Sequence, residues 1–78
     1  MKTAVIGAGA WGTALAKVVH LNGGDVYLWG RDPEALAALG QAGRNERYLP
    51  GVDLPADLPT EADLAKAVDG AGCVVLAI

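Results

Sequence analysis

Apolar residues occur along this 78-residue chain in short runs that are separated by glycine-rich and polar segments. Three runs rich in β-branched and apolar residues, at residues 3–6, 26–29 and 73–78, predict strands. The last run is uninterrupted, which is typical of a strand buried on both faces in a parallel sheet. Residues 10–21 contain strong helix formers and predict a helix that ends at residues 22–24, with apolar positions at Leu15, Val18, Val19 and Leu21.

Two further helices are predicted in the second half of the chain. Asp32 can cap the free amides of a helix and Pro33 suits its first turn, so a helix begins here and ends at Gly40 or Gly43. Residues 60–63 read T-E-A-D, which resembles a capping box and predicts a third helix. The apolar face of that helix is formed by Leu64, Ala67 and Val68, and the helix ends at residues 69–72.

Residues 43–59 contain three prolines, Pro50, Pro55 and Pro59, and little periodicity. They predict a loop with at most a very short strand near Leu58. Strands and helices therefore alternate, which predicts an α/β fold with a parallel sheet, right-handed crossovers and helices on both faces. We expect the doubly wound strand order 3-2-1-4, in which the short strand is third and the run at residues 73–78 is fourth.

The run at residues 73–78 would lie at an edge of this sheet with two apolar faces. A natural domain rarely ends inside its own core, and an exposed strand of this type invites aggregation. We therefore expect a truncated domain that continues in a longer protein. We also expect low stability for residues 1–78 alone, because so short a chain buries a smaller share of its surface than a larger domain does.

Composition restricts the class of protein. Apolar residues make up 53% of the chain, charged residues make up 19%, and the net charge is −3. This combination argues against disorder and against a nucleic-acid partner, which needs a basic face. Neither a signal peptide nor a run of roughly 18–20 apolar residues is present, so we expect a cytoplasmic protein with no membrane partner. Cys73 cannot form an internal disulfide, and we expect a small buried hydrophobe in a reducing compartment.

The segment from Gly7 to Gly12 reads G-A-G-A-W-G and joins the first predicted strand to the first helix. In this pattern Gly7 allows a tight turn, Gly9 lets the backbone approach a pyrophosphate, and Gly12 lets the helix pack on the strand. Amides at the helix start, including that of Trp11, point toward such a ligand, and the helix dipole favours its negative charge. The pattern predicts a dinucleotide site. The ring of Trp11 either shields the cofactor or fills space beneath a second domain.

The end of the second strand distinguishes the two nicotinamide cofactors. An NAD site usually has an acidic residue here that binds the ribose 2′-hydroxyl. In this chain the position is Gly30, and Arg31 follows with a permanently charged donor for a 2′-phosphate. We therefore expect NADP(H) to be accepted, alongside or instead of NAD(H). Asp32 could still reach the ribose, but its place before Pro33 favours the helix cap.

The remaining polar residues point to no further site. His20 lies on the first helix far from the glycine loop and is most simply a structural residue. The chain has no second histidine and no cysteine pair, so we expect no zinc site, and it has no P-loop motif. Residues 44–51 form a compact polar segment that could cover the adenine end of a cofactor, although an ordinary connection is the simpler interpretation.

Several motifs together resemble the NAD(P)-dependent glycerol-3-phosphate dehydrogenases of the bacterial type. They are V-I-G-A-G-A-W-G-T-A-L-A from Val5, V-Y-L-W-G-R-D from Val26, N-E-R-Y-L-P-G-V-D-L-P from Asn45, and T-E-A-D-L with V-V-L-A-I near the C-terminus. The resemblance implies an N-terminal Rossmann domain over residues 1–78, followed by a helical substrate domain that contains the catalytic lysines. It implies cofactor contacts at Ala10, Trp11, Arg31 and Tyr48.

The activity of that family is the reversible reduction of dihydroxyacetone phosphate to sn-glycerol 3-phosphate, a step toward phospholipid backbones. The resemblance thus implies the cofactor-binding part of an oxidoreductase, with no catalytic residue in this chain and a homodimer for the full-length protein. Dehydrogenases of the hydroxyacyl-CoA, 6-phosphogluconate and ketopantoate types begin similarly and are one alternative. Ligand-sensing Rossmann domains of ion-channel regulators are a second, non-enzymatic alternative, but they usually keep an acid at the position of Gly30.

Overall fold

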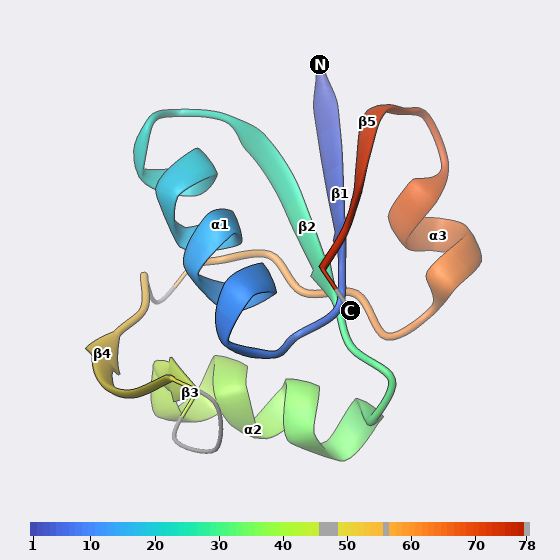
Figure 1. Cartoon of the computed structure of the whole chain (residues 1–78). Helices are drawn as coiled ribbons and strands as arrows, with labels where there is room; N and C mark the ends of the chain where they lie inside the picture. The colour runs from blue at the N-terminus through green and yellow to red at the C-terminus, as the bar shows by residue number, and fades with distance from the viewer. Residues whose placement is uncertain (46–48, 56, 78) are drawn as a thin grey trace.

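The computed structural model of the chain describes residues 1–45, 49–55 and 57–77. Strands β1 (Lys2–Ile6), β2 (Asp25–Trp29) and β5 (Ala71–Leu76) form a parallel sheet in the order β2-β1-β5. Figure 1 shows helices α1 (Ala10–Leu21) and α3 (Leu64–Val68) on opposite sides of this sheet, with α2 (Pro33–Ala42) below its lower end. The predicted α/β fold with a parallel sheet and helices on both faces is therefore confirmed.

The three parallel strands end at one edge of the sheet. Ile6 of β1 pairs with Trp29 of β2 and with Leu76 of β5. Beyond these residues the Gly7 amide donates to the Trp29 carbonyl at 2.8 Å, and the Ala77 amide donates to the Ile6 carbonyl at 2.8 Å. The glycine loop, the segment after β2 and the end of β5 consequently meet at this edge, where open α/β sheets bind their ligands.

The third position of the predicted strand order is occupied by a single bridge and not by a strand. Leu28 of β2 forms one parallel bridge with Thr60. The Leu28 amide donates to the Pro59 carbonyl at 3.1 Å, and the Glu61 amide donates to the Leu28 carbonyl at 2.9 Å. Prolines lack the amide that a ladder needs, which explains why the expected strand near Leu58 does not form.

The prediction of a loop for residues 43–59 is partly wrong. Strands β3 (Arg44–Asn45) and β4 (Leu49–Asp53) form a two-stranded antiparallel sheet. Pro50 lies within β4, and proline is tolerated there because a strand paired on one side only has amides that need no partner in the ladder. The prolines of this segment therefore did not prevent short strands from forming.

The helix caps follow the sequence for α2 and depart from it for α3. The Asp32 carboxylate accepts from the amides of the first turn of α2, and the helix ends at Gly43, whose φ of 65° is left-handed. For α3 the expected capping box is wrong, because Asp63 is the N-cap and accepts from the amides of Ala65 and Lys66 at 2.9 and 3.3 Å. Thr60 is held at the edge of β2 instead. Among the described residues, no helix has the length and hydrophobicity that crossing a membrane requires.

The core lies between α1, α2 and the sheet. Its buried residues are Val5, Ala16, Val26, Leu28, Leu36, Leu39, Leu54 and Leu58. Helix α1 contributes the small residues Gly12, Thr13 and Ala16 to its buried face. Of the four apolar positions noted on this helix, Leu15 and Val19 pack against the core, whereas Val18 and Leu21 are 55% and 64% exposed.

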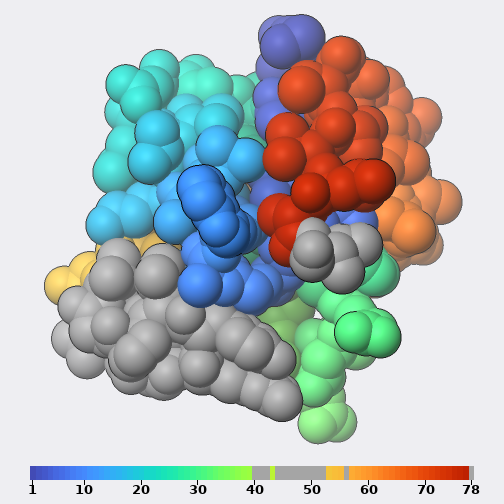
Figure 2. All heavy atoms as spheres, viewed as in Figure 1, coloured from blue at the N-terminus to red at the C-terminus, as the bar shows by residue number. Residues whose placement is uncertain are grey.

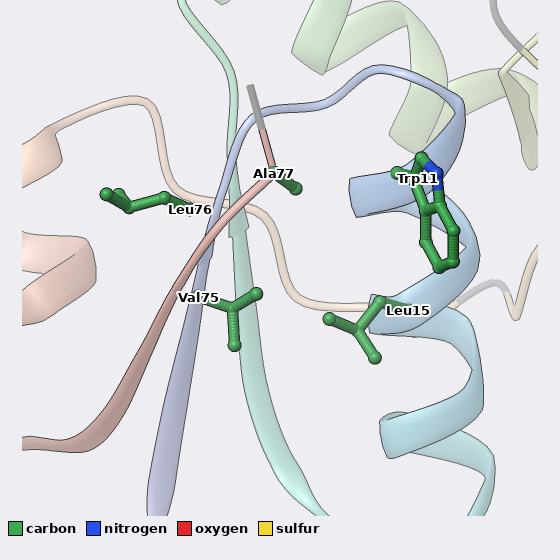
Figure 3. A pocket seen from close by; sticks show the side chains of 5 residues that line it. All are labelled: Trp11, Leu15, Val75, Leu76 and Ala77. Atoms are coloured by element: carbon green, nitrogen blue, oxygen red, sulfur yellow. The ribbon is translucent and has the colours of Figure 1, made fainter.

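Strand β5 is an outer strand of the sheet, on the side of β1 opposite β2. It is less buried than its apolar sequence predicts. Its residues alternate between half-buried and exposed, with Leu76 72% exposed. Cys73 is half-buried, so the expectation of a buried cysteine is wrong. Because successive side chains of a strand point to opposite faces, the alternation means that the face with Val74 and Leu76 is exposed, while Val75 on the other face points toward α1 (Figure 3).

Candidate functional site

The glycine loop connects β1 to α1 with the backbone geometry that the sequence predicts. Gly7 has a φ of 125°, which a residue with a side chain rarely adopts, and the chain turns out of β1 there. A Cβ on Gly12 would fall on the carbonyl oxygen of Gly7. The first turn of α1 therefore packs so closely on the loop that position 12 requires glycine.

Gly9 lies between Gly7 and Gly12 and faces open space. A Cβ at this position would have no neighbouring atom within 4 Å. Gly9 is also the N-cap of α1, no side chain caps the helix there, and the first turn contains no acidic residue. The first amides of an α-helix have no partner within the helix, and its dipole places partial positive charge at this end. The loop thus offers uncapped donors, including the amides of Ala10 and Trp11, to an anionic group that approaches over Gly9.

Thr13 holds the loop in place, a role that the sequence analysis did not assign. Its side chain is fully buried, and its hydroxyl donates to the Ala8 carbonyl at 3.2 Å. The Thr13 amide also donates to the Gly9 carbonyl at 3.0 Å. The signal in the sequence is a polar residue directly after the last glycine of the motif, on the helix face that the glycine brings against the loop.

The two charged residues that follow β2 are in different situations. Asp32 is engaged, because its carboxylate accepts from the amides of Glu34 and Ala35 at 3.0 and 3.3 Å. The predicted capping role of Asp32 is therefore confirmed. Arg31 is exposed, and its guanidinium has no hydrogen bond or ion pair within the part of the chain that the structure describes. Its charge remains available for a ligand at this edge of the sheet.

A shallow apolar groove runs between the first turns of α1 and the end of β5. It is lined by Trp11, Leu15, Val75, Leu76 and Ala77. Figure 3 shows Val75 and Ala77 pointing toward α1, and Leu76 pointing away from it. In Figure 2 the first turn of α1 (blue) and the end of β5 (red) face each other at the surface. The Trp11 side of the groove is open, because this residue is 81% exposed and does not belong to the core of the chain.

His20 lies near the C-terminal end of α1, away from this edge. The Nε2 atom of His20 is 3.0 Å from the Asp57 carboxylate, and this contact holds the pKa of Asp57 below its usual range, mainly through the side-chain hydrogen bond. His20 thus has the structural role that its position indicates. Tyr48 lies outside the described residues, so its predicted cofactor contact stays a prediction.

Comparison with known proteins places nearly the whole chain in one group. A family model described as the N-terminus of NAD-dependent glycerol-3-phosphate dehydrogenase matches residues 2–78. The chain is 48% identical over 75 residues to an NAD(P)+ glycerol-3-phosphate dehydrogenase of Stenotrophomonas maltophilia. It is 54% identical over 82 residues to an enzyme of the same name from Cupriavidus pinatubonensis. These alignments cover 96% and 99% of this chain, but 22% and 23% of the two relatives.

The fold leads to the same group. The crystal structure of a glycerol-3-phosphate dehydrogenase from Coxiella burnetii matches with a TM-score of 0.84 at 35% identity. That match covers 96% of this chain and 23% of the crystallised one. The chain therefore spans less than a quarter of the length of these relatives, while almost all of it has a counterpart in them. From residue 2 to residue 78, the chain belongs to the family of N-terminal regions of NAD-dependent glycerol-3-phosphate dehydrogenases.

Proposed function

We propose that the chain binds the pyrophosphate of NADP(H) or NAD(H) over Gly9. Gly7 and Gly12 give the loop its shape, and the amides of Ala10 and Trp11 donate to the phosphate oxygens. The observation that supports this proposal most is the uncapped start of α1 beneath open space at Gly9. A pyrophosphate is an anion that suits such a helix end, and glycine without a Cβ allows its close approach.

Arg31 is the proposed contact for the 2′-phosphate of NADP(H). It lies at the same edge of the sheet as the glycine loop, it is exposed, and its neighbour Asp32 is engaged in the cap of α2. A guanidinium offers paired donors that match a phosphate group, whereas the ribose hydroxyl of NAD(H) gains less from it. We expect NADP(H) to be accepted alongside NAD(H). Tyr48 is a further proposed contact on the strength of the resemblance alone.

The complete protein is proposed to interconvert dihydroxyacetone phosphate and sn-glycerol 3-phosphate for glycerophospholipid synthesis, as a cytoplasmic homodimer. Family membership and the names of the relatives support this reaction. The nicotinamide, when bound, supplies or accepts the hydride. Residues 1–78 are the N-terminal part of the cofactor-binding domain, which binds and orients the dinucleotide, and the groups that act on the substrate lie in a helical domain outside this chain.

The test is a substrate assay on the complete gene product. Purified protein is mixed with NADPH and dihydroxyacetone phosphate, and oxidation of the cofactor is followed by its absorbance. Three other substrates are tested in parallel. A hydroxyacyl-CoA and 6-phosphogluconate are tested with the oxidised cofactor, and ketopantoate is tested with the reduced one. Turnover with dihydroxyacetone phosphate above the others supports the proposal. Faster turnover with another substrate, or cofactor binding without turnover of any of them, overturns it in favour of another dehydrogenase or a ligand-sensing domain.

A further inference from the structure

Gly30, the position where an acidic residue would select NAD(H), has no room for a side chain. It is buried at the end of β2, between the glycine loop and α2. A Cβ built on it would lie 2.9 Å from the Cβ of Ala8 and 3.5 Å from a terminal methyl of Leu36. Carbon atoms in van der Waals contact are about 3.5–4.0 Å apart, so the first of these contacts is a collision.

Ala8 cannot yield to such a side chain without moving the loop. Its methyl group is attached directly to the backbone and has no rotamer that would move it aside. The backbone on each side is held, because the Gly7 amide donates to Trp29 at 2.8 Å and the buried Thr13 hydroxyl donates to the Ala8 carbonyl at 3.2 Å. A residue larger than glycine at position 30 would therefore displace the segment that carries the uncapped amides of α1.

We propose that Ala8 and Gly30 act together to determine cofactor selectivity. The Ala8 methyl occupies the space that a side chain at position 30 would need. Arg31 is therefore the residue after β2 that distinguishes NADP(H) from NAD(H). An acidic residue at position 30 alone then weakens the binding of both cofactors, because it shifts the loop that holds their common pyrophosphate. It favours NAD(H) only when the methyl of Ala8 is removed as well. This inference rests on the proposed dinucleotide site.

The experiment is a double-mutant cycle in the complete gene product. Dissociation constants for NADPH and NADH are measured by calorimetric titration for the wild type and for Ala8→Gly, Gly30→Asp and the double variant, and thermal unfolding is recorded for each protein. We expect Gly30→Asp to weaken both cofactors by about 5- to 150-fold, which corresponds to the usual cost of overpacking of about 1–3 kcal/mol. The double variant should regain NADH affinity to within about tenfold of the wild type, with an NADH preference that neither single variant shows.

Two results would overturn the inference: a switch to NADH by Gly30→Asp alone, or a double variant that binds NADH as weakly as Gly30→Asp. Gly30→Ala, which adds the methyl without a charge, keeps the test valid if Gly30→Asp does not fold. It should weaken both cofactors in the same direction, and Ala8→Gly should relieve that loss; unchanged binding by Gly30→Ala counts against the collision. A wild type that binds neither dinucleotide refutes the proposed function itself and is recognised before any variant is compared.

Discussion

The same glycine-to-alanine change should affect stability differently at two positions of the glycine motif, Gly9 and Gly12. At Gly12 the added methyl falls on the Gly7 carbonyl oxygen, so α1 must move away from the loop. Overpacking of this kind lowers the free energy of unfolding by about 1–3 kcal/mol. At Gly9 the φ of −75° suits alanine, and the methyl has no neighbour within 4 Å. Alanine lowers the entropy of the unfolded chain, which raises the free energy of unfolding by about 0.4–1 kcal/mol. Alanine is also a poorer N-cap than glycine, which lowers the free energy of unfolding by a similar amount.

The expected net change in stability for Gly9→Ala is therefore within about 1 kcal/mol of zero. Its methyl nevertheless stands where the pyrophosphate is proposed to approach, and a steric cost of about 1–3 kcal/mol would weaken binding by about 5- to 150-fold. Urea unfolding and NADPH titration of the complete gene product separate the two effects. Gly9→Ala should keep the unfolding midpoint and lose affinity, whereas Gly12→Ala should lose both. Wild-type affinity in Gly9→Ala would refute a pyrophosphate over Gly9, and wild-type stability in Gly12→Ala would refute the close packing of α1.

Three further predictions concern single side chains. Arg31→Ala should raise the dissociation constant for NADPH by about tenfold, because it removes about one charge-assisted hydrogen bond. The dissociation constant for NADH should stay nearly unchanged. Equal effects on the two cofactors in paired titrations would remove the argument for the 2′-phosphate. Thr13→Val should weaken NADPH binding by about fivefold, because it loses the hydrogen bond to the Ala8 carbonyl. Thr13→Ser keeps the hydroxyl and should keep the affinity. Equal affinities of the two variants would contradict this role of Thr13. The lowered pKa of Asp57 means that its contact with His20 stabilises the fold above the unfolded value of 3.8 and that this contribution is lost as pH falls through the folded pKa. The urea midpoint of Asp57→Asn should then fall below that of the wild type near neutral pH and approach it in acid, and a constant difference would speak against this linkage.

Local features of the fold could be predicted because neighbouring residues determine them. The runs that form β1, β2 and β5 have the composition of buried strands, and the structure places a parallel sheet there. Asp32 before Pro33 can reach the amides of its own helix, so the cap of α2 depended on residues within four positions. The shape of the glycine loop likewise follows from its own glycines.

The errors occur where a distant segment competes with the local preference. The residues 60–63 have the pattern of a capping box, but β2 holds Thr60 through a bridge to Leu28, and the helix starts at Asp63. The apolar positions noted on α1 do not define its buried face. The residues buried there are small, because a Cβ on Gly12 would fall on the Gly7 carbonyl oxygen. Hydrophobicity alone does not indicate which face of a helix can come near enough.

The dinucleotide motif, the alternation of strands and helices, and the resemblance to one dehydrogenase family are properties of the linear order of residues. The function of Gly30 is different in kind. The sequence shows only that an acidic residue is missing there. The tertiary structure adds the reason, since the pairing of Ile6 with Trp29 brings Ala8 against position 30, more than twenty residues away along the chain. Contacts between residues so far apart depend on strand register and on the packing of rigid backbone, and neither is encoded in the residues near either position.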